Sequence, residues 1–180
     1  MTSADKPSED VEYITPPDEW RKKVRVMSKR EAAKFDPVKA AEQAIARLAK
    51  NFPNWMETEA RALVEQHDVI RRDGLNADTL DPLYQAAHNI KGQAQTLGYP
   101  LIGEVAGSLC TLIECVPSVD KIPPALLARH VESIRAMVLE NARDENNQTG
   151  AELLATLRSV TADVIAPYAA AREDDEASSF

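Results

Sequence analysis

The apolar residues between positions 80 and 97 recur at steps of three and four, the spacing that places side chains on one face of an α-helix. The stripe consists of Leu80, Leu83, Ala87, Ile90, Ala94 and Leu97. A stripe of this length has to be buried against other helices to contribute to stability. No strand-like alternation of useful length occurs elsewhere in the sequence, so the pattern predicts an all-α bundle.

His88 belongs to the opposite face of this predicted helix. At about 100° per residue, it lies about 130° from the centre of the apolar stripe. Residues three or four positions away share its face, which makes Tyr84, Lys91 and Gly92 its neighbours. A glycine inside a helix costs about 0.5–1 kcal/mol relative to alanine, so Gly92 indicates a need for open space. We therefore expect an exposed imidazole beside a cation and a gap.

This arrangement suits the transfer of a phosphoryl group. A solvated imidazole near neutral pH has a nucleophilic nitrogen that can accept the group. Lys91 could offset the negative charge of the product, and Gly92 could leave room for the partner that delivers it. Taken alone, a histidine three residues before a lysine is most often an ordinary surface pair, so the longer string around it has to decide.

The string HNIKGQAQTLG, residues 88–98, resembles the phospho-accepting motif of histidine phosphotransfer (HPt) domains, which act in two-component phosphorelays. The motif positions are His88, Ile90, Lys91, Gly92, Ala94, Leu97 and Gly98. The resemblance continues more weakly through residues 100–114, where such domains carry a second bundle helix with small residues near its start and an acidic residue near its end. Many HPt domains have small residues, often serine, where this chain has Gln93 and Ala94.

The resemblance implies a phosphocarrier: His88 would accept a phosphoryl group on Nε2 from a receiver-domain aspartate and pass it to another receiver. Lys91 would assist by its charge and Gly92 by its small size. The implied partners are receiver domains of response regulators and of a hybrid histidine kinase. Mg²⁺ would come from the receiver, and no intrinsic cofactor or metal is expected. Contacts with the partner are expected at Tyr84, Gln85, Gln95 and Tyr99.

Caps and breaks in the pattern divide the chain into six expected helices. They cover residues 37–50, 54–72, 77–97, 101–116, 124–143 and about 153–168, with Asp36, Asn54, and Asn76 or Asp78 as the first three N-caps. The NNQTG segment at 146–150 breaks the pattern before the last helix, whose apolar stripe is Leu153, Leu157, Val160 and Val164. The second to fifth helices predict an antiparallel up-and-down four-helix bundle with additional N-terminal and C-terminal helices. The expected segments are a disordered tail at 1–36 with a basic segment at 21–30, an HPt-like bundle at 37–145, an additional helix at 146–170 and an acidic tail at 171–180.

The charge of the chain narrows the class of partner. The net charge is −8, which disfavours nucleic acid and anionic membranes, since both require a basic surface, and so favours a protein partner. The sequence shows neither a membrane-length apolar run nor the apolar centre of a signal peptide, so we expect a cytoplasmic protein. We also expect a monomer, although the last helix leaves dimerisation open. Cys110 and Cys115 lack metal or redox spacing. His67 is expected to be packed or at the boundary of the core, and His130 at the edge of its helix.

Four alternatives belong to other classes. An HPt-like bundle could bind receivers as an adaptor without transferring phosphate, although the intact His88 argues against this. Two chains could form a dimeric, kinase-like bundle, which a solution mass would reveal. A helical metal carrier is disfavoured because the three histidines have no ligand spacing. An autokinase is also disfavoured, since the sequence has neither a glycine-rich nucleotide loop nor an Asp/Asn cluster for two magnesium ions.

Overall fold

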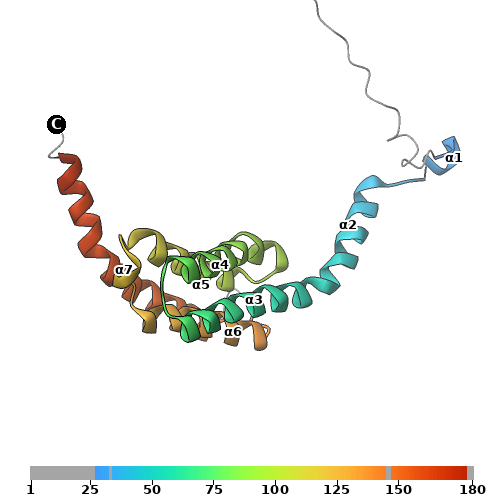
Figure 1. Cartoon of the computed structure of the whole chain (residues 1–180). Coiled ribbons are helices and arrows are strands. Elements are labelled where there is room, and N and C mark those ends of the chain that lie inside the picture. Colours follow the sequence, from blue (N-terminus) through green and yellow to red (C-terminus); the bar gives the residue numbers. More distant parts are fainter. Residues whose placement is uncertain (1–26, 33, 145–146, 178–180) are drawn as a thin grey trace, which may run out of the picture. The chain divides into compact units, whose positions relative to one another are not determined.

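A computed structural model describes residues 27–32, 34–144 and 147–177, with backbone alone from residue 170 onward (Figure 1). The chain divides into two compact units, Met1–Gln43 and Ala44–Phe180, which we describe separately. The described residues are helical and contain no strand, which confirms the all-α class. None of the helices in these ranges has the length and apolar character needed to cross a membrane. Most of the expected tail at 1–36, including residues 21–26 of the basic segment, lies outside the described residues.

The first unit contains the one-turn helix α1 (Lys29–Ala32) and the start of α2 (Pro37–Leu48). Asp36 caps α2 as predicted, because its Oδ1 accepts hydrogen bonds from the backbone N–H groups of Val38 and Lys39 at 3.0 and 3.1 Å. However, α2 buries none of its residues: Val38 and Ile45 are more than 60% exposed. The N-cap at Asp36 therefore predicted the start of α2 correctly, although the helix buries no side chain.

The second unit is built on α3 (Phe52–Asp73), α4 (Ala77–Leu97), α5 (Pro100–Cys115) and α6 (Pro124–Leu139). Both α3 and α5 pack against α4 and against α6, so the four helices close around one core. Short connections join consecutive helices, which makes neighbours antiparallel (Figure 1). This arrangement confirms the predicted four-helix bundle. Its largest fully buried side chains include Met56, Leu63, Leu83, Ile90, Ile102, Leu109, Leu112, Leu127 and Ile134.

The helix that carries His88 begins and ends as its sequence predicts. The Asn76 side chain accepts from the backbone N–H of Thr79, and the Thr79 hydroxyl accepts from the Asn76 N–H, which completes a capping box. At the other end, Gly98 has the left-handed conformation (φ 83°), and the Tyr99 N–H donates to the Ala94 carbonyl at 2.8 Å. Both ends of α4 are thus fixed by local interactions.

Two predicted boundaries were wrong. Helix α3 begins at Phe52, with Asn51 at the N-cap position, because a 3-10 turn (Ala49–Asn51) leads directly into it and Asn54 already lies inside the helix. Helix α6 ends at Leu139 instead of about residue 143. Asn141 takes a left-handed conformation (φ 52°) and closes the helix with the same pair of backbone bonds that ends α4.

Helix α7 (Gln148–Ala177) packs against α5 and α6, as expected for an additional helix on the bundle. It begins at the NNQTG segment that was expected to break the pattern, because Asn147 Oδ1 accepts from the Gly150 N–H at 2.8 Å. It also continues beyond residue 168 through 171–177, which was expected to be a tail; residues 178–180 lie outside the described residues. Its buried residues include Leu154, Leu157 and Thr161, while Val160 of the expected stripe is 42% exposed.

Candidate functional site

The site is organised around His88 on the outer face of α4. Leu83, Ala87 and Ile90 of the apolar stripe are fully buried, and His88 is exposed, as the helical spacing predicts. The stripe fixes the rotation of α4 about its axis, because turning the helix would expose these side chains. The position of the imidazole is therefore a consequence of the core packing beneath it.

Tyr84 lies one turn before His88 and contacts it. The two ring centroids are 5.8 Å apart, and the ring planes are tilted by 39°. The Tyr84 hydroxyl donates a hydrogen bond of 2.6 Å to Glu114 Oε1 on α5. This bond to a carboxylate raises the pKa of Tyr84 to about 12, since losing the phenolic proton would bring two negative charges together. Tyr84 is half-buried and was expected to contact a partner; the structure shows it bonded within the bundle.

Lys91 lies one turn after His88, and its stem runs along α5. A Cβ atom built on Gly107 would meet the Lys91 side-chain carbons Cγ, Cδ and Cε at 3.9–4.0 Å. Lys91 is exposed, so its ammonium can reach solvent while the stem packs on the neighbouring helix. The equivalent Cβ on Gly92 would meet nothing within 4 Å. His88 thus has a cation on its own face and open space at Gly92.

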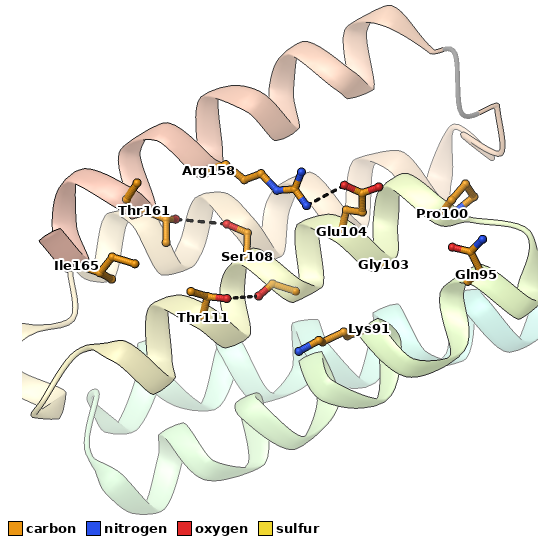
Figure 2. A pocket seen from close by; sticks show the side chains of 12 residues that line it. Lys91, Gln95, Pro100, Gly103, Glu104, Ser108, Thr111, Arg158, Thr161 and Ile165 are labelled. Atoms are coloured by element: carbon orange, nitrogen blue, oxygen red, sulfur yellow. Dashed lines mark hydrogen bonds and ion pairs between the residues drawn. The ribbon is translucent and has the colours of Figure 1, made fainter. Parts of the chain in front are cut away.

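A groove of about 530 Å³ begins at Lys91 and runs between α4, α5 and α7. Figure 2 shows Lys91 and Gln95 along one side, with Arg158 and Ile165 of α7 along the other. Gly103 lies between them, and its Cβ position is 3.2 Å from the Ala94 Cβ, which shows how closely α4 and α5 approach. The small residues of α5 therefore determine the depth of this groove.

Two polar contacts join α5 to α7 across the groove (Figure 2). Arg158 Nη2 lies 2.8 Å from Glu104 Oε2, in an ion pair about half exposed to solvent. About one turn further along both helices, the buried hydroxyls of Ser108 and Thr161 are 3.4 Å apart. An exposed ion pair contributes little stability, so these contacts mainly set the register of α7 on the bundle.

Of the other three residues predicted to contact a partner, two are exposed and one is buried. Gln85 and Gln95 are exposed on α4, so a partner can reach both. Tyr99 is 1% exposed, and its placement at a partner surface was wrong. Its hydroxyl donates to Asn141 Oδ1 at 2.6 Å, and the Arg143 guanidinium lies 4.8 Å from its ring centroid. Tyr99 follows the left-handed Gly98, where an apolar residue usually packs back on its helix.

The remaining histidines show no metal-binding arrangement. His67 is half-buried, and burial lowers its pKa. His130 was expected at the edge of its helix but is fully buried, and its two ring nitrogens are hydrogen-bonded to Ser108 and to the Leu126 carbonyl. The described residues contain no cluster of three or more metal-ligating side chains. Cys110 is buried in the core and Cys115 is partly buried, and burial raises the pKa of the Cys110 thiol to about 11.

Sequence reasoning did not identify Glu114 and Gly107 as residues of the site. Both lie on α5, and they reach the face of His88 through long-range packing that helical periodicity does not reveal. The available signals were the run of small residues at 106–108 and the acid near the end of the helix. These signals indicate close helix packing, but they do not say which side chain of α4 is contacted.

The family model of the Hpt domain matches residues 39–160, about two thirds of the chain. The chain therefore belongs to the Hpt domain family. The four-helix bundle and the predicted motif on α4 both lie within the matched segment. Hpt domains carry phosphoryl groups in phosphorelays and interact with receiver domains. Searches of curated proteins and of solved structures gave no match.

Proposed function

We propose that His88 accepts a phosphoryl group from the aspartate of one receiver domain and passes it to the aspartate of another. The observation that supports this role is the position of His88 on α4. Its imidazole is exposed, Lys91 lies on the same face, and the space at Gly92 is open. No other histidine of the chain combines these properties, since His67 is half-buried and His130 is buried.

In the accepting step, the lone pair of the His88 Nε2 attacks the phosphorus of the receiver's aspartyl phosphate. The bond between phosphorus and the carboxylate oxygen breaks, and the aspartate leaves as a carboxylate. The ring proton stays on Nδ1 during the attack. In the donating step, the carboxylate of a second receiver attacks the phosphorus, and the P–N bond breaks to regenerate neutral His88. The phosphoryl group is conserved throughout, so this exchange needs neither ATP nor water.

The negative charge of the phosphoryl group is offset partly by Lys91 and partly by the receiver domain. Phosphohistidine carries about two negative charges near neutral pH, and Lys91 can offset part of this charge from its own face of α4. We assign the Mg²⁺ that the reaction requires to the receiver. Gly92 provides clearance, because a side chain there would project toward a partner that approaches His88. The partners we propose are a hybrid histidine kinase and response regulators, through their receiver domains.

The test is incubation of the protein with a panel of phosphorylated receiver domains, with acid-labile, alkali-stable label followed on the wild type and on His88→Ala. We expect label on the wild type and none on the variant. Lys91→Ala should slow the transfer without abolishing it, because it removes charge and leaves the nucleophile. Label that survives in His88→Ala would disprove the assignment of the acceptor, and receiver binding without any label would place the protein among adaptors.

A further inference from the structure

The imidazole of His88 has one aromatic neighbour in the structure, the ring of Tyr84. The two rings lie 5.8 Å apart between centroids, within the range at which aromatic pairs interact. His88 is otherwise exposed, and an exposed side chain samples several rotamers. The orientation of the imidazole therefore depends on how firmly the Tyr84 ring is itself held.

A hydrogen bond from the neighbouring helix α5 holds Tyr84 in place. Its hydroxyl donates to Glu114 Oε1 over 2.6 Å, the short distance typical of an O–H group bonded to a carboxylate. The bond joins α4 to α5 across thirty positions of sequence, so it depends on the packed bundle. The hydrogen bond to Glu114 raises the pKa of Tyr84 to about 12, so the phenol keeps its proton and remains a donor near neutral pH.

We propose that Glu114 is a positioning residue for phosphotransfer and that it acts on His88 through Tyr84. The carboxylate fixes the tyrosine ring, and the ring restricts the imidazole to orientations that present its outer nitrogen to a partner. This inference rests on the proposed function of His88. Glu114 does not contact the phosphoryl group in this proposal. It raises the fraction of protein molecules in which the His88 imidazole is oriented for the reaction.

The arrangement makes a specific prediction about variants. Tyr84→Phe keeps the ring and removes the hydrogen bond, and Glu114→Ala removes the acceptor. Each variant should lower the maximal rate of phosphorylation at His88 about three- to tenfold, the scale expected when one ordered side chain is released. The double variant should be no slower than either single variant, because both substitutions break the same bond. Glu114→Gln retains an oxygen that accepts, so it should recover part of the rate.

Two phosphodonors separate this proposal from the function on which it rests. Phosphoramidate reacts without a receiver: His88 attacks phosphorus, the P–N bond of the donor breaks, and ammonia leaves. Reaction with a phosphorylated receiver adds a docking step. We expect slower labelling from both donors and an unchanged half-saturating receiver concentration, because positioning affects reaction more than binding. Glu132→Ala removes an exposed carboxylate of an ion pair on α6 and is the matched control, with a wild-type rate expected.

An NMR measurement tests the positioning without any phosphate. Contacts between the His88 and Tyr84 ring protons should be strong in the wild type and in Glu132→Ala, and weak in Glu114→Ala. Equal labelling rates in wild type, Tyr84→Phe and Glu114→Ala would overturn the positioning role, and so would a double variant that shows the product of the two single effects. A wild type that takes no label from any donor would instead contradict the proposed function of His88.

Discussion

His130 on α6 and Ser108 on α5 form a hydrogen bond inside the bundle, with 3.0 Å between Nε2 and Oγ. The other ring nitrogen lies 2.9 Å from the Leu126 carbonyl, which can only accept, so Nδ1 carries the proton. In the neutral ring, Nε2 then accepts from the Ser108 hydroxyl, whose oxygen lies 3.4 Å from that of Thr161. This buried chain of polar groups links α6, α5 and α7 next to the groove that leads to Lys91.

The buried imidazole makes stability depend on pH. Burial lowers the pKa of His130, and the bond to Leu126 offsets part of this shift. An unfolded histidine has a pKa of about 6.5, so below this pH the unfolded chain binds a proton that the folded chain resists. The free energy of unfolding should therefore fall as pH drops from about 6.5 toward the lower folded pKa. Urea unfolding between pH 7.5 and 5.5 measures this slope.

The variant His130→Gln tests whether the buried imidazole causes this dependence of stability on pH. The variant should be less stable at every pH, but its stability should change less across the window. A residual slope is expected from His67, whose pKa is also lowered by burial. Equal slopes in the wild type and in His130→Gln would show that the buried imidazole does not resist protonation.

Two substitutions at Gly92 test its effects on stability and on phosphotransfer separately. In Gly92→Ala, the added methyl group meets nothing within 4 Å, and alanine favours a helix over glycine by about 0.5–1 kcal/mol. The free energy of unfolding should rise by about this amount. Gly92→Gln places a longer side chain toward the partner and should slow transfer from a receiver while the fold stays intact. Unchanged transfer in Gly92→Gln would refute the clearance that we assign to this glycine.

Gly103→Ala is the matched substitution on α5, and it should have the opposite sign. The new methyl group would lie 3.2 Å from the Ala94 Cβ, which is fixed to the backbone of α4. The two helices would have to separate, and crowding of this kind costs about 1–3 kcal/mol, more than the gain in helix propensity. Thermal unfolding of both alanine variants checks the pair. Stabilisation of Gly103→Ala would mean that α4 and α5 pack less closely than described.

Two apolar residues of helix α7 that differ in burial provide a third comparison of stability. Leu157 is 5% exposed and Val160 is 42% exposed, although the sequence pattern had placed both on the buried stripe. Leu157→Ala should cost about 2–5 kcal/mol, the range for truncating a buried leucine, and Val160→Ala much less. Denaturant unfolding of the two variants measures the difference. Similar losses would indicate that α7 packs with a different face on the bundle.

The sequence predicted best where local interactions determine the structure. The apolar steps from Leu80 to Leu97 defined the buried face of α4, and its start was narrowed to two candidate caps, Asn76 and Asp78, of which the structure shows Asn76. These signals placed His88 on the exposed face before any neighbouring helix was known. The prediction succeeded because α4 packs against two helices through one stripe, and a single stripe leaves one free face.

The errors arose where tertiary contacts override local pattern. Tyr99 was expected to be available to a partner, but it packs against the end of α6 through Asn141, forty-two positions away. The link from Glu114 to Tyr84 spans thirty positions, and periodicity contains no information about it. The buried face of α7 was misjudged because polar Thr161 replaces an apolar residue there, with its hydroxyl near Ser108.

The carrier role requires His88 to donate its phosphoryl group as well as to accept it. The most direct test therefore begins with the protein phosphorylated at His88 and freed of its donor, and then adds an unphosphorylated receiver. The account predicts that label leaves His88 and appears on the receiver, with no transfer to a receiver whose phospho-accepting aspartate is replaced by asparagine. Label that stays on His88 with every receiver tested, or that is released only as inorganic phosphate, would contradict a carrier.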